Sequence, residues 1–131
     1  MDYTIKTVCK ELNMTVHTVR HYCNMGLVPN LRHDKYGNRI FDEESINWLK
    51  AASFLRDSGL SIAEIKQYFD LSLEGKSSIN KRYEILCNLE EKAAKELEEA
   101  KLRKDCISQK VRECKDIMEG KRKDELNPLN W

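Results

Sequence analysis

The chain has 131 residues, of which 40% are hydrophobic and 34% charged, and its net charge is +1. This length suits one small domain with an appended helix, and the high charged fraction indicates a long exposed helix. No apolar run approaches the ~20 residues that span a bilayer, and the N-terminus has no apolar signal segment. We therefore expect a cytoplasmic protein without membrane contacts, whose five irregularly spaced cysteines are free thiols.

Two short helices joined by a tight turn are predicted at the N-terminus. Thr4 caps a helix over residues 5–12, and Thr15 caps a second helix from residue 16 to about residue 24, which Gly26 ends. In the second helix Val16, Val19 and Cys23 are spaced to face inward. The remaining side chains are then expected to point outward: His17, Thr18, Arg20, His21 and Tyr22.

This pair of helices forms a helix-turn-helix pattern whose second helix carries hydrogen-bonding side chains. Such a face suits the DNA major groove, which is about 12 Å wide and displays a donor and acceptor code. The same pattern also fits an ordinary amphipathic helix. Residues 1–41 hold six Lys or Arg against three Asp or Glu, which on its own is a modest indication of nucleic-acid binding.

A hairpin is predicted between residues 27 and 41, with its tip at Tyr36–Gly37–Asn38. A basic hairpin beside a recognition helix is the wing of a winged helix, and it can reach phosphates or a minor groove. Taken alone, the segment also fits a solvated basic loop. The basic side chains around the tip are Arg32, His33, Lys35 and Arg39.

Two further helices follow the hairpin. Asp42 begins the third helix, which Ser58–Gly59 ends, and Ser61 with Glu64 forms a capping box at the start of the fourth. The third helix is expected to bury Ile46, Leu49, Ala52, Phe54 and Leu55, and the fourth Ile62, Ile65, Tyr68, Phe69 and Leu71. Residues 73–78 form a connector.

A long helix is predicted from about residue 79 to residue 118, where no Pro or Gly occurs. Ten of twelve positions spaced alternately by four and three are apolar, and only Glu90 and Lys104 interrupt them. A helix about 60 Å long cannot bury this seam alone, so we expect a homodimer; a heterodimer with a related chain is the alternative. The expected interface residues are Tyr83, Leu86, Ala93, Leu97, Ala100, Ile107, Val111 and Cys114.

Several motifs in order resemble the DNA-binding domain of the MerR family of transcriptional regulators. The resemblance spans about residues 3–71, and the long helix after it is similar to that family's dimerisation helix. The motifs are Tyr3-Thr4-Ile5, Thr15-Val16-His17-Thr18-Val19-Arg20-His21-Tyr22, Gly26-Leu27-Val28-Pro29, Gly37-Asn38-Arg39-Ile40-Phe41 and Leu55-Arg56-Asp57-Ser58-Gly59-Leu60-Ser61-Ile62.

The resemblance implies a mainly α fold, in which a winged helix-turn-helix precedes a dimerisation helix that pairs antiparallel with its mate. It implies a dimer that binds a pseudo-palindromic operator and distorts promoter DNA so that RNA polymerase can engage both promoter elements. Arg20 and Tyr22 match residues of the family's recognition helix. Arg39 matches the family's wing arginine, and Arg56 matches a residue that contacts phosphate. The chain departs from the family's aromatic positions at His21, Asn38 and Phe41.

These inferences define three segments: a DNA-binding domain over residues 1–75, a coiled-coil helix over residues 76–119 and a short tail over residues 120–131. Double-stranded DNA, a second copy of the chain and RNA polymerase are the expected partners. The residues expected to contact DNA are Thr15, His17, Thr18, Arg20, His21, Tyr22, Arg32, Lys35, Gly37, Asn38, Arg39 and Arg56.

The signal that such a regulator would sense is the least defined feature. The tail is too short to bury a ligand pocket. Cys106 and Cys114 lie about 12 Å apart along a helix, too far to share one metal ion with bonds of about 2.3 Å, although a site across a dimer stays open. Cys87 and Cys106 are candidate redox thiols, and Lys110 would favour the thiolate of Cys106; inert surface thiols are the alternative.

No catalytic constellation, phosphate-binding loop or cofactor motif occurs in the sequence, so we expect neither an enzyme nor a bound cofactor. Two other functions fit parts of the pattern. One is a DNA-binding accessory module, such as an excisionase or an anti-repressor, which usually lacks a long dimerisation helix. The other is a coiled-coil adaptor whose N-terminal domain binds protein, and which would show no salt-dependent DNA affinity.

Overall fold

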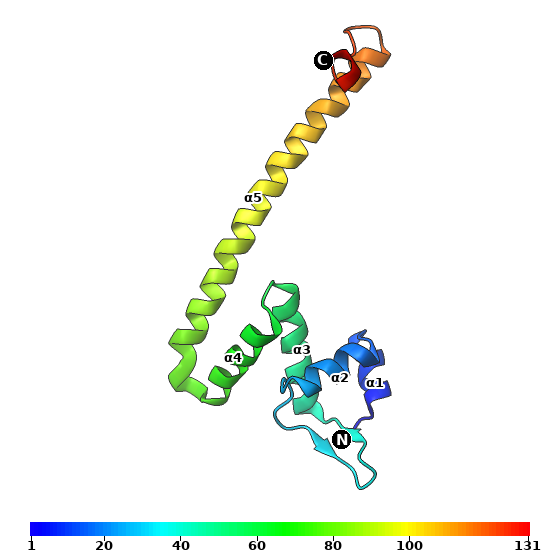
Figure 1. Ribbon diagram of the computed structural model, residues 1–131. Coiled ribbons are helices and arrows are strands. Elements are labelled where there is room, and N and C mark those ends of the chain that lie inside the picture. Colours follow the sequence, from blue (N-terminus) through cyan, green and yellow to red (C-terminus); the bar gives the residue numbers. More distant parts are fainter. The chain divides into compact units, whose positions relative to one another are not determined.

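The computed structural model describes all residues from Met1 to Trp131, which form two compact units, Met1–Leu89 and Glu90–Trp131. In the first unit four helices and a hairpin follow one another in the predicted order (Figure 1). The elements of the chain are α1 (Ile5–Leu12), α2 (Val16–Asn24), β1 (Arg32–His33), β2 (Arg39–Ile40), α3 (Glu43–Asp57), α4 (Ile62–Leu73), a 3-10 turn η1 (Gly75–Ser78), α5 (Ile79–Met118) and a 3-10 turn η2 (Pro128–Asn130).

The helix boundaries follow from side-chain caps. The Thr4 hydroxyl accepts a hydrogen bond from the Thr7 amide at the start of α1. Complete capping boxes begin α3 at Asp42 and α4 at Ser61, as the sequence predicted for Ser61. Each cap satisfies an amide that the first helical turn leaves unpaired, which stabilises a helix by about 1 kcal/mol where the site is shielded from water.

The core of the first unit lies between α1, α2, α3 and α4. Leu49 of α3 and Ile65 of α4 are fully buried, and the ring of Phe69 meets Trp48 edge to face with centroids 4.8 Å apart. Each such aliphatic or aromatic side chain contributes about 1.5–3 kcal/mol when it is removed from water. Partly buried side chains of the first turns of α5, Ile85 and Leu89, pack on the same core.

In α3 one predicted core residue was wrong. Phe54 was placed in the apolar stripe of the third helix, but 64% of its surface is exposed. The buried positions of α3 recur every three residues, from Ile46 through Leu49 and Ala52 to Leu55. Position 54 lies on the opposite face of the helix from Ala52, because two residues turn an α-helix by about 200°.

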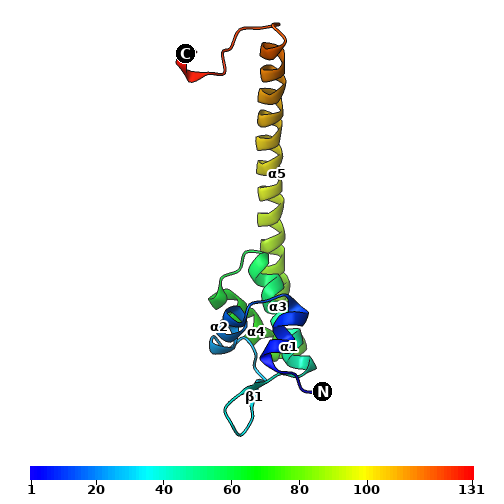
Figure 2. The ribbon, with the colours of Figure 1, turned by 90° about the vertical axis from the view of Figure 1, so that its right-hand side faces the viewer.

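The hairpin is small and antiparallel. Arg32 pairs with Ile40, and His33 with Arg39. A bridge between Tyr3 and Phe41 ties the N-terminus to the end of the second strand. Figure 2 shows the loop of the hairpin projecting beyond the helices α1 and α2. The two strands are therefore a wing that extends from the helical core.

The second unit contains most of α5 and the tail. Gly120 ends the helix in a left-handed conformation, with φ +75°, and Lys121 donates its amide to the carbonyl of Asp116. The tail then folds on itself, where the indole nitrogen of Trp131 donates a 2.9 Å hydrogen bond to the carbonyl of Glu125. No helix in the protein is long and apolar enough to cross a membrane.

Candidate nucleic-acid interface

The first turn of α2 presents polar groups at a helix N-terminus. The Thr15 hydroxyl accepts a 3.1 Å hydrogen bond from the Thr18 amide, and the two threonine hydroxyls lie 2.8 Å apart. His17, Arg20 and His21 are exposed on the same helix. The N-terminal end of a helix carries a partial positive charge that favours phosphate groups. This end of α2 can therefore approach a nucleic-acid backbone while its side chains reach base edges.

Tyr22 does not point outward, contrary to the prediction. Only 6% of its surface is exposed, whereas Val16, which was expected to face inward, is 38% exposed. The helix α2 packs against both α1 and α3, so its buried face extends over Val19, Tyr22 and Cys23. Burial raises the pKa of the Tyr22 hydroxyl, and the nearby positive charge of Arg56 opposes that rise.

Arg56 lies in the last turn of α3 and is exposed. Its Nη1 donates a 3.1 Å hydrogen bond to the carbonyl of Leu60, which holds the guanidinium near the turn between α3 and α4. Because Arg56 acts on the pKa of Tyr22, the two side chains share one electrostatic environment. Two of the residues that the resemblance matched, Tyr22 of α2 and Arg56 of α3, are therefore neighbours in the electrostatic sense.

The tip of the hairpin is organised by Asp34. Its Oδ1 accepts 2.9 Å hydrogen bonds from the amides of Tyr36 and Asn38, and its Oδ2 accepts one from the Asn38 side chain. These hydrogen bonds lower the pKa of Asp34. Gly37 has φ +83°, a left-handed conformation that glycine adopts without strain. Asn38 thus has a structural role in the free protein, besides its predicted contact with DNA.

The basic side chains of the wing have partners of different strength. Arg32 forms a 2.8 Å ion pair with Asp2, and both side chains are more than half exposed. The ammonium of Lys35 lies 5.1 Å from the ring centre of Tyr36. Exposed ion pairs and cation–π contacts of this kind contribute at most about 1 kcal/mol, so a phosphate can replace or join them at low cost.

Arg39 is the most constrained basic residue of the wing. It is half-buried, and its Nη2 donates a 2.8 Å hydrogen bond to Oδ1 of Asn24, at the end of α2. Its Nε is buried without a hydrogen-bond partner. The positive charge of Arg39 also reaches Cys23, where it partly offsets the rise in thiol pKa that burial causes. Arg39 therefore bonds the wing to the recognition helix.

Sequence reasoning missed the residues that hold this interface together. Asn24 was not singled out, although a side-chain amide at the C-terminal end of a recognition helix can accept a hydrogen bond from a basic residue of the wing. Asn30 donates a 2.9 Å hydrogen bond to Asp42, which caps α3. The amide and hydroxyl of Ser45 and the Asn30 side chain together lower the pKa of Asp42 to about 2. Such long-range pairings leave no periodic signal in a sequence.

The apolar seam of α5 is exposed in the single chain. The exposed fraction is 66% for Tyr83, 58% for Leu97 and 62% for both Ile107 and Val111. Ala93, Ala100 and Cys114 are exposed too, and Leu86 is 40% exposed. A monomeric protein rarely exposes apolar side chains in such a continuous row. This face of α5 therefore needs a covering surface.

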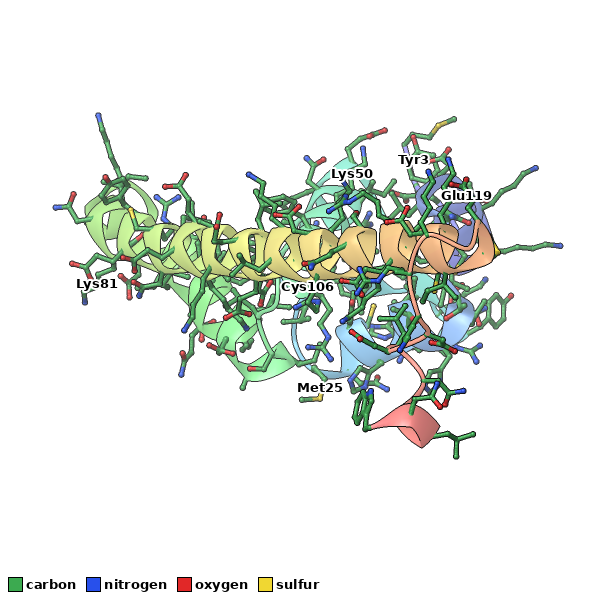
Figure 3. The ribbon with its side chains drawn as sticks, turned by 90° about the horizontal axis from the view of Figure 1, so that it is seen from above. Tyr3, Met25, Lys50, Lys81, Cys106 and Glu119 are labelled. Carbon is green, nitrogen blue, oxygen red and sulfur yellow. The ribbon has the colours of Figure 1, made fainter.

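The cysteines of α5 differ in exposure. Cys87 is half-buried, and Cys106 and Cys114 are exposed; Figure 3 labels Cys106 on the helix between Lys81 and Glu119. Lys110, which the sequence predicted to favour the thiolate of Cys106, forms a 3.7 Å ion pair with Glu113. No group of three or more His, Cys, Asp or Glu side chains is arranged to hold a metal ion. In the first unit, Cys9 and Cys23 are half-buried.

The comparison with protein families decides what this arrangement is. Residues 3–72 match the family described as MerR HTH family regulatory protein. They include the winged helix-turn-helix, α3 and all but the last residue of α4. The chain belongs to the MerR family. It is thus a DNA-binding transcriptional regulator of the MerR type, as the motifs of the sequence indicated.

Solved MerR structures resemble most of the chain. A MerR family regulator from Bacillus thuringiensis is 33% identical, with a TM-score of 0.73 over 86% of this chain and 99% of that one. HiNmlR, described as a MerR family regulator that lacks the sensor domain and is bound to promoter DNA, is 27% identical, with a TM-score of 0.76 over 92% and 96% of the two chains. An uncharacterised HTH-type transcriptional regulator of Haemophilus influenzae is 28% identical over 85% of this chain and 82% of its own length.

Proposed function

We propose that this MerR protein binds a pseudo-palindromic promoter operator as a homodimer, with α2 in the major groove and the hairpin beside it as a wing. The observation that carries this proposal is the exposed row of His17, Arg20 and His21 on a helix fastened to a basic wing by Asn24 and Arg39. The residues proposed to contact DNA are those named from the sequence: Thr15, His17, Thr18, Arg20, His21, Tyr22, Arg32, Lys35, Gly37, Asn38, Arg39 and Arg56.

Within this set, the exposure of each side chain distinguishes contacts to bases from contacts to phosphates. Arg20 is exposed on α2 and has the reach to read base edges, as arginine most often reads guanine. Arg32 and Lys35 are exposed on the wing and suit phosphate contacts, which position a protein on the duplex. Tyr22 can contribute only through its hydroxyl, because its ring is part of the core.

The division of the chain into residues 1–75 for DNA binding, 76–119 for dimerisation and 120–131 as a tail is part of the proposal. This division is supported by the exposed apolar row of α5, which a second copy of the same helix would cover. The interface residues are those of the seam: Tyr83, Leu86, Ala93, Leu97, Ala100, Ile107, Val111 and Cys114.

We further propose that the dimer distorts the promoter so that RNA polymerase engages it. Two DNA-binding domains joined through one interface contact successive parts of the duplex, and their contacts offset a bending cost of roughly 1–6 kcal/mol. HiNmlR, a MerR regulator that lacks a sensor domain, is bound to promoter DNA in its structure. A chain of this length can therefore be sufficient for promoter binding.

The input signal is proposed to act through a thiol. Cys106 is exposed and Cys87 is half-buried, so both are accessible to small oxidants or electrophiles. Substituting each by serine separately and recording promoter output with and without an electrophile identifies the responding thiol. An unchanged response in both variants removes these cysteines from the proposal.

Footprinting of the full-length protein on the DNA upstream of its own gene tests the main proposal. We expect one protected region with two symmetric halves, and hypersensitive bonds at its centre where the DNA is deformed. Transcription from the same fragment in vitro should change when the protein is added. Protection without any change in transcription would favour an accessory DNA-binding module, and no protection at all would refute operator binding at this site.

A further inference from the structure

Two charged residues interrupt the apolar seam of α5, and they have opposite signs. Glu90 and Lys104 lie one heptad before and one heptad after Leu97, and all three occupy the same position of the heptad. Both charged side chains are exposed, and neither forms an ion pair within its own chain. Charge in a seam destabilises a coiled coil unless its partner compensates for it, so these two positions constrain how two helices can pair.

The two possible orientations treat these charges differently. In a parallel, in-register pair each residue faces its own copy, so Glu90 meets the partner's Glu90 and Lys104 meets the partner's Lys104. Both contacts bring like charges together in a seam. In an antiparallel pair centred near the middle of α5, Glu90 and the partner's Lys104 lie in neighbouring layers. The contact occurs twice by symmetry, and both times the charges are opposite.

We propose that Glu90 and Lys104 are specificity residues that hold two copies of α5, paired antiparallel, in one register. The inference rests on the homodimer proposed above and on the antiparallel pairing that the family resemblance implies. It adds the alignment of the two helices and the residues that select it. In this register Leu97 faces the partner's Ala100, and each seam position from Ile79 to Met118 has a seam position of the partner opposite it. Shifting one helix by a heptad leaves seam positions at both ends uncovered.

The neighbouring charges select the same register. Glu96 and Arg103 flank the seam, are exposed and form no ion pair within the chain. With Leu97 opposite the partner's Ala100, Glu96 lies beside the partner's Arg103. A shift of one heptad in one direction places Glu96 beside the partner's Glu96. The opposite shift places Arg103 beside the partner's Arg103, so either slip replaces an attraction by a repulsion.

The sizes of the opposing side chains agree with this alignment. Lys104 faces the partner's Ala93, whose small side chain leaves room for the long apolar stem of the lysine. The ammonium can then extend toward the partner's Glu90 at the edge of the seam. Glu90 itself faces the partner's Ile107, which covers its methylene groups. The two interruptions of the seam therefore discriminate against wrong partners and wrong alignments rather than merely weaken the helix pair.

Charge exchange tests this proposal on the full chain by analytical ultracentrifugation. Glu90→Lys and Lys104→Glu each create two like-charge contacts per dimer, and we expect each to raise the dimer Kd at least about tenfold. The double variant Glu90→Lys/Lys104→Glu should return the Kd to within about threefold of the unmodified chain. It should not exchange subunits with the unmodified chain, because a mixed antiparallel dimer again faces like charges. Single variants that dimerise as tightly as the unmodified chain would overturn the proposal.

A distance measurement gives the orientation directly. A spin label is placed on Cys106 in a chain whose other cysteines are replaced by serine. The antiparallel register separates the two labels by about 22 Å along the axis, from the 1.5 Å rise per residue, and a parallel pair leaves them roughly 10–15 Å apart. A short distance in a stable dimer overturns the orientation but keeps the proposed dimer, whereas a monomer in solution refutes the dimer itself.

Discussion

Arg39 of the wing donates a 2.8 Å hydrogen bond from Nη2 to Oδ1 of Asn24 in the recognition helix α2. This contact fixes the wing relative to α2 before DNA arrives. Removing it with Asn24→Ala should leave the wing more mobile and weaken operator binding by about 0.5–1.5 kcal/mol, the net contribution of one hydrogen bond. Fluorescence anisotropy with operator DNA measures the effect. Asn47→Ala, at an exposed position of α3, serves as the control and should bind normally; equal affinities for both variants would contradict the role of Asn24.

Tyr22 has two separable roles. Its ring is buried, so Tyr22→Ala should destabilise the first unit by about 3 kcal/mol through the cavity it leaves. Tyr22→Phe keeps the ring and removes the hydroxyl that lies in the electrostatic environment of Arg56. We expect this variant to fold normally and to bind DNA more weakly. Thermal melts together with operator titrations distinguish the two effects, and unchanged DNA affinity of Tyr22→Phe would limit Tyr22 to the core.

Arg20 should carry sequence discrimination. Arg20→Ala is expected to weaken binding to the operator by about 1–3 kcal/mol and to reduce the preference over unrelated DNA. Lys35→Ala should instead weaken binding to all sequences and lower the slope of log K against log salt by about one. Arg112→Ala, an exposed arginine of α5 outside the proposed interface, is the matched control. If Arg20→Ala leaves the operator preference intact, α2 is not the recognition helix.

The cap of α3 predicts a pH dependence of stability. Hydrogen bonds from Ser45 and Asn30 lower the pKa of Asp42 from 3.8 to about 2. A carboxyl group with a lowered folded pKa stabilises the fold above its unfolded pKa and loses that contribution as the pH falls toward its folded pKa. The difference in melting temperature between the unmodified chain and Asp42→Asn should therefore shrink between about pH 5 and pH 2. A difference that does not change with pH would contradict this account of the cap.

The proposed dimer makes a simple prediction at the centre of α5. Leu97 and Leu102 are almost equally exposed in the single chain, at 58% and 57%, but only Leu97 lies in the seam. Leu97→Glu should abolish the dimer, because it places a charge in the middle of the interface. Leu102→Glu changes the same chemistry on the outer face and should leave the dimer intact. Sedimentation measurements compare the two, and a dimeric Leu97→Glu protein would refute the interface.

The sequence predicted the helices well because their ends are marked locally. Thr4, Thr15, Asp42 and Ser61 cap four helices at the predicted positions, and the long helix begins and ends where the predicted one does. A capping side chain bonds to an amide two or three residues away, so its signal lies within a few residues of sequence. Strand pairing around Gly37 was predicted for the same local reason.

The errors arose where one helix packs against more than one neighbour. Tyr22 was assigned to the outer face of α2, and Phe54 to the inner face of α3, because a single apolar stripe was assumed for each. How wide the buried face is depends on the neighbouring helices, which the sequence alone does not place. The contact between Asn24 and Arg39 joins side chains from separate elements, and it follows only from the fold.

In the proposed dimer, the exposed apolar row of α5 links the activity of this regulator to its abundance. If two copies cover that row, the amount of dimer at low concentration rises with the square of the amount of chain, so a twofold change in expression changes it about fourfold. A promoter that responds to the dimer would then amplify small differences in synthesis or degradation. Gene dosage would act as a regulatory input in its own right, alongside any chemical signal.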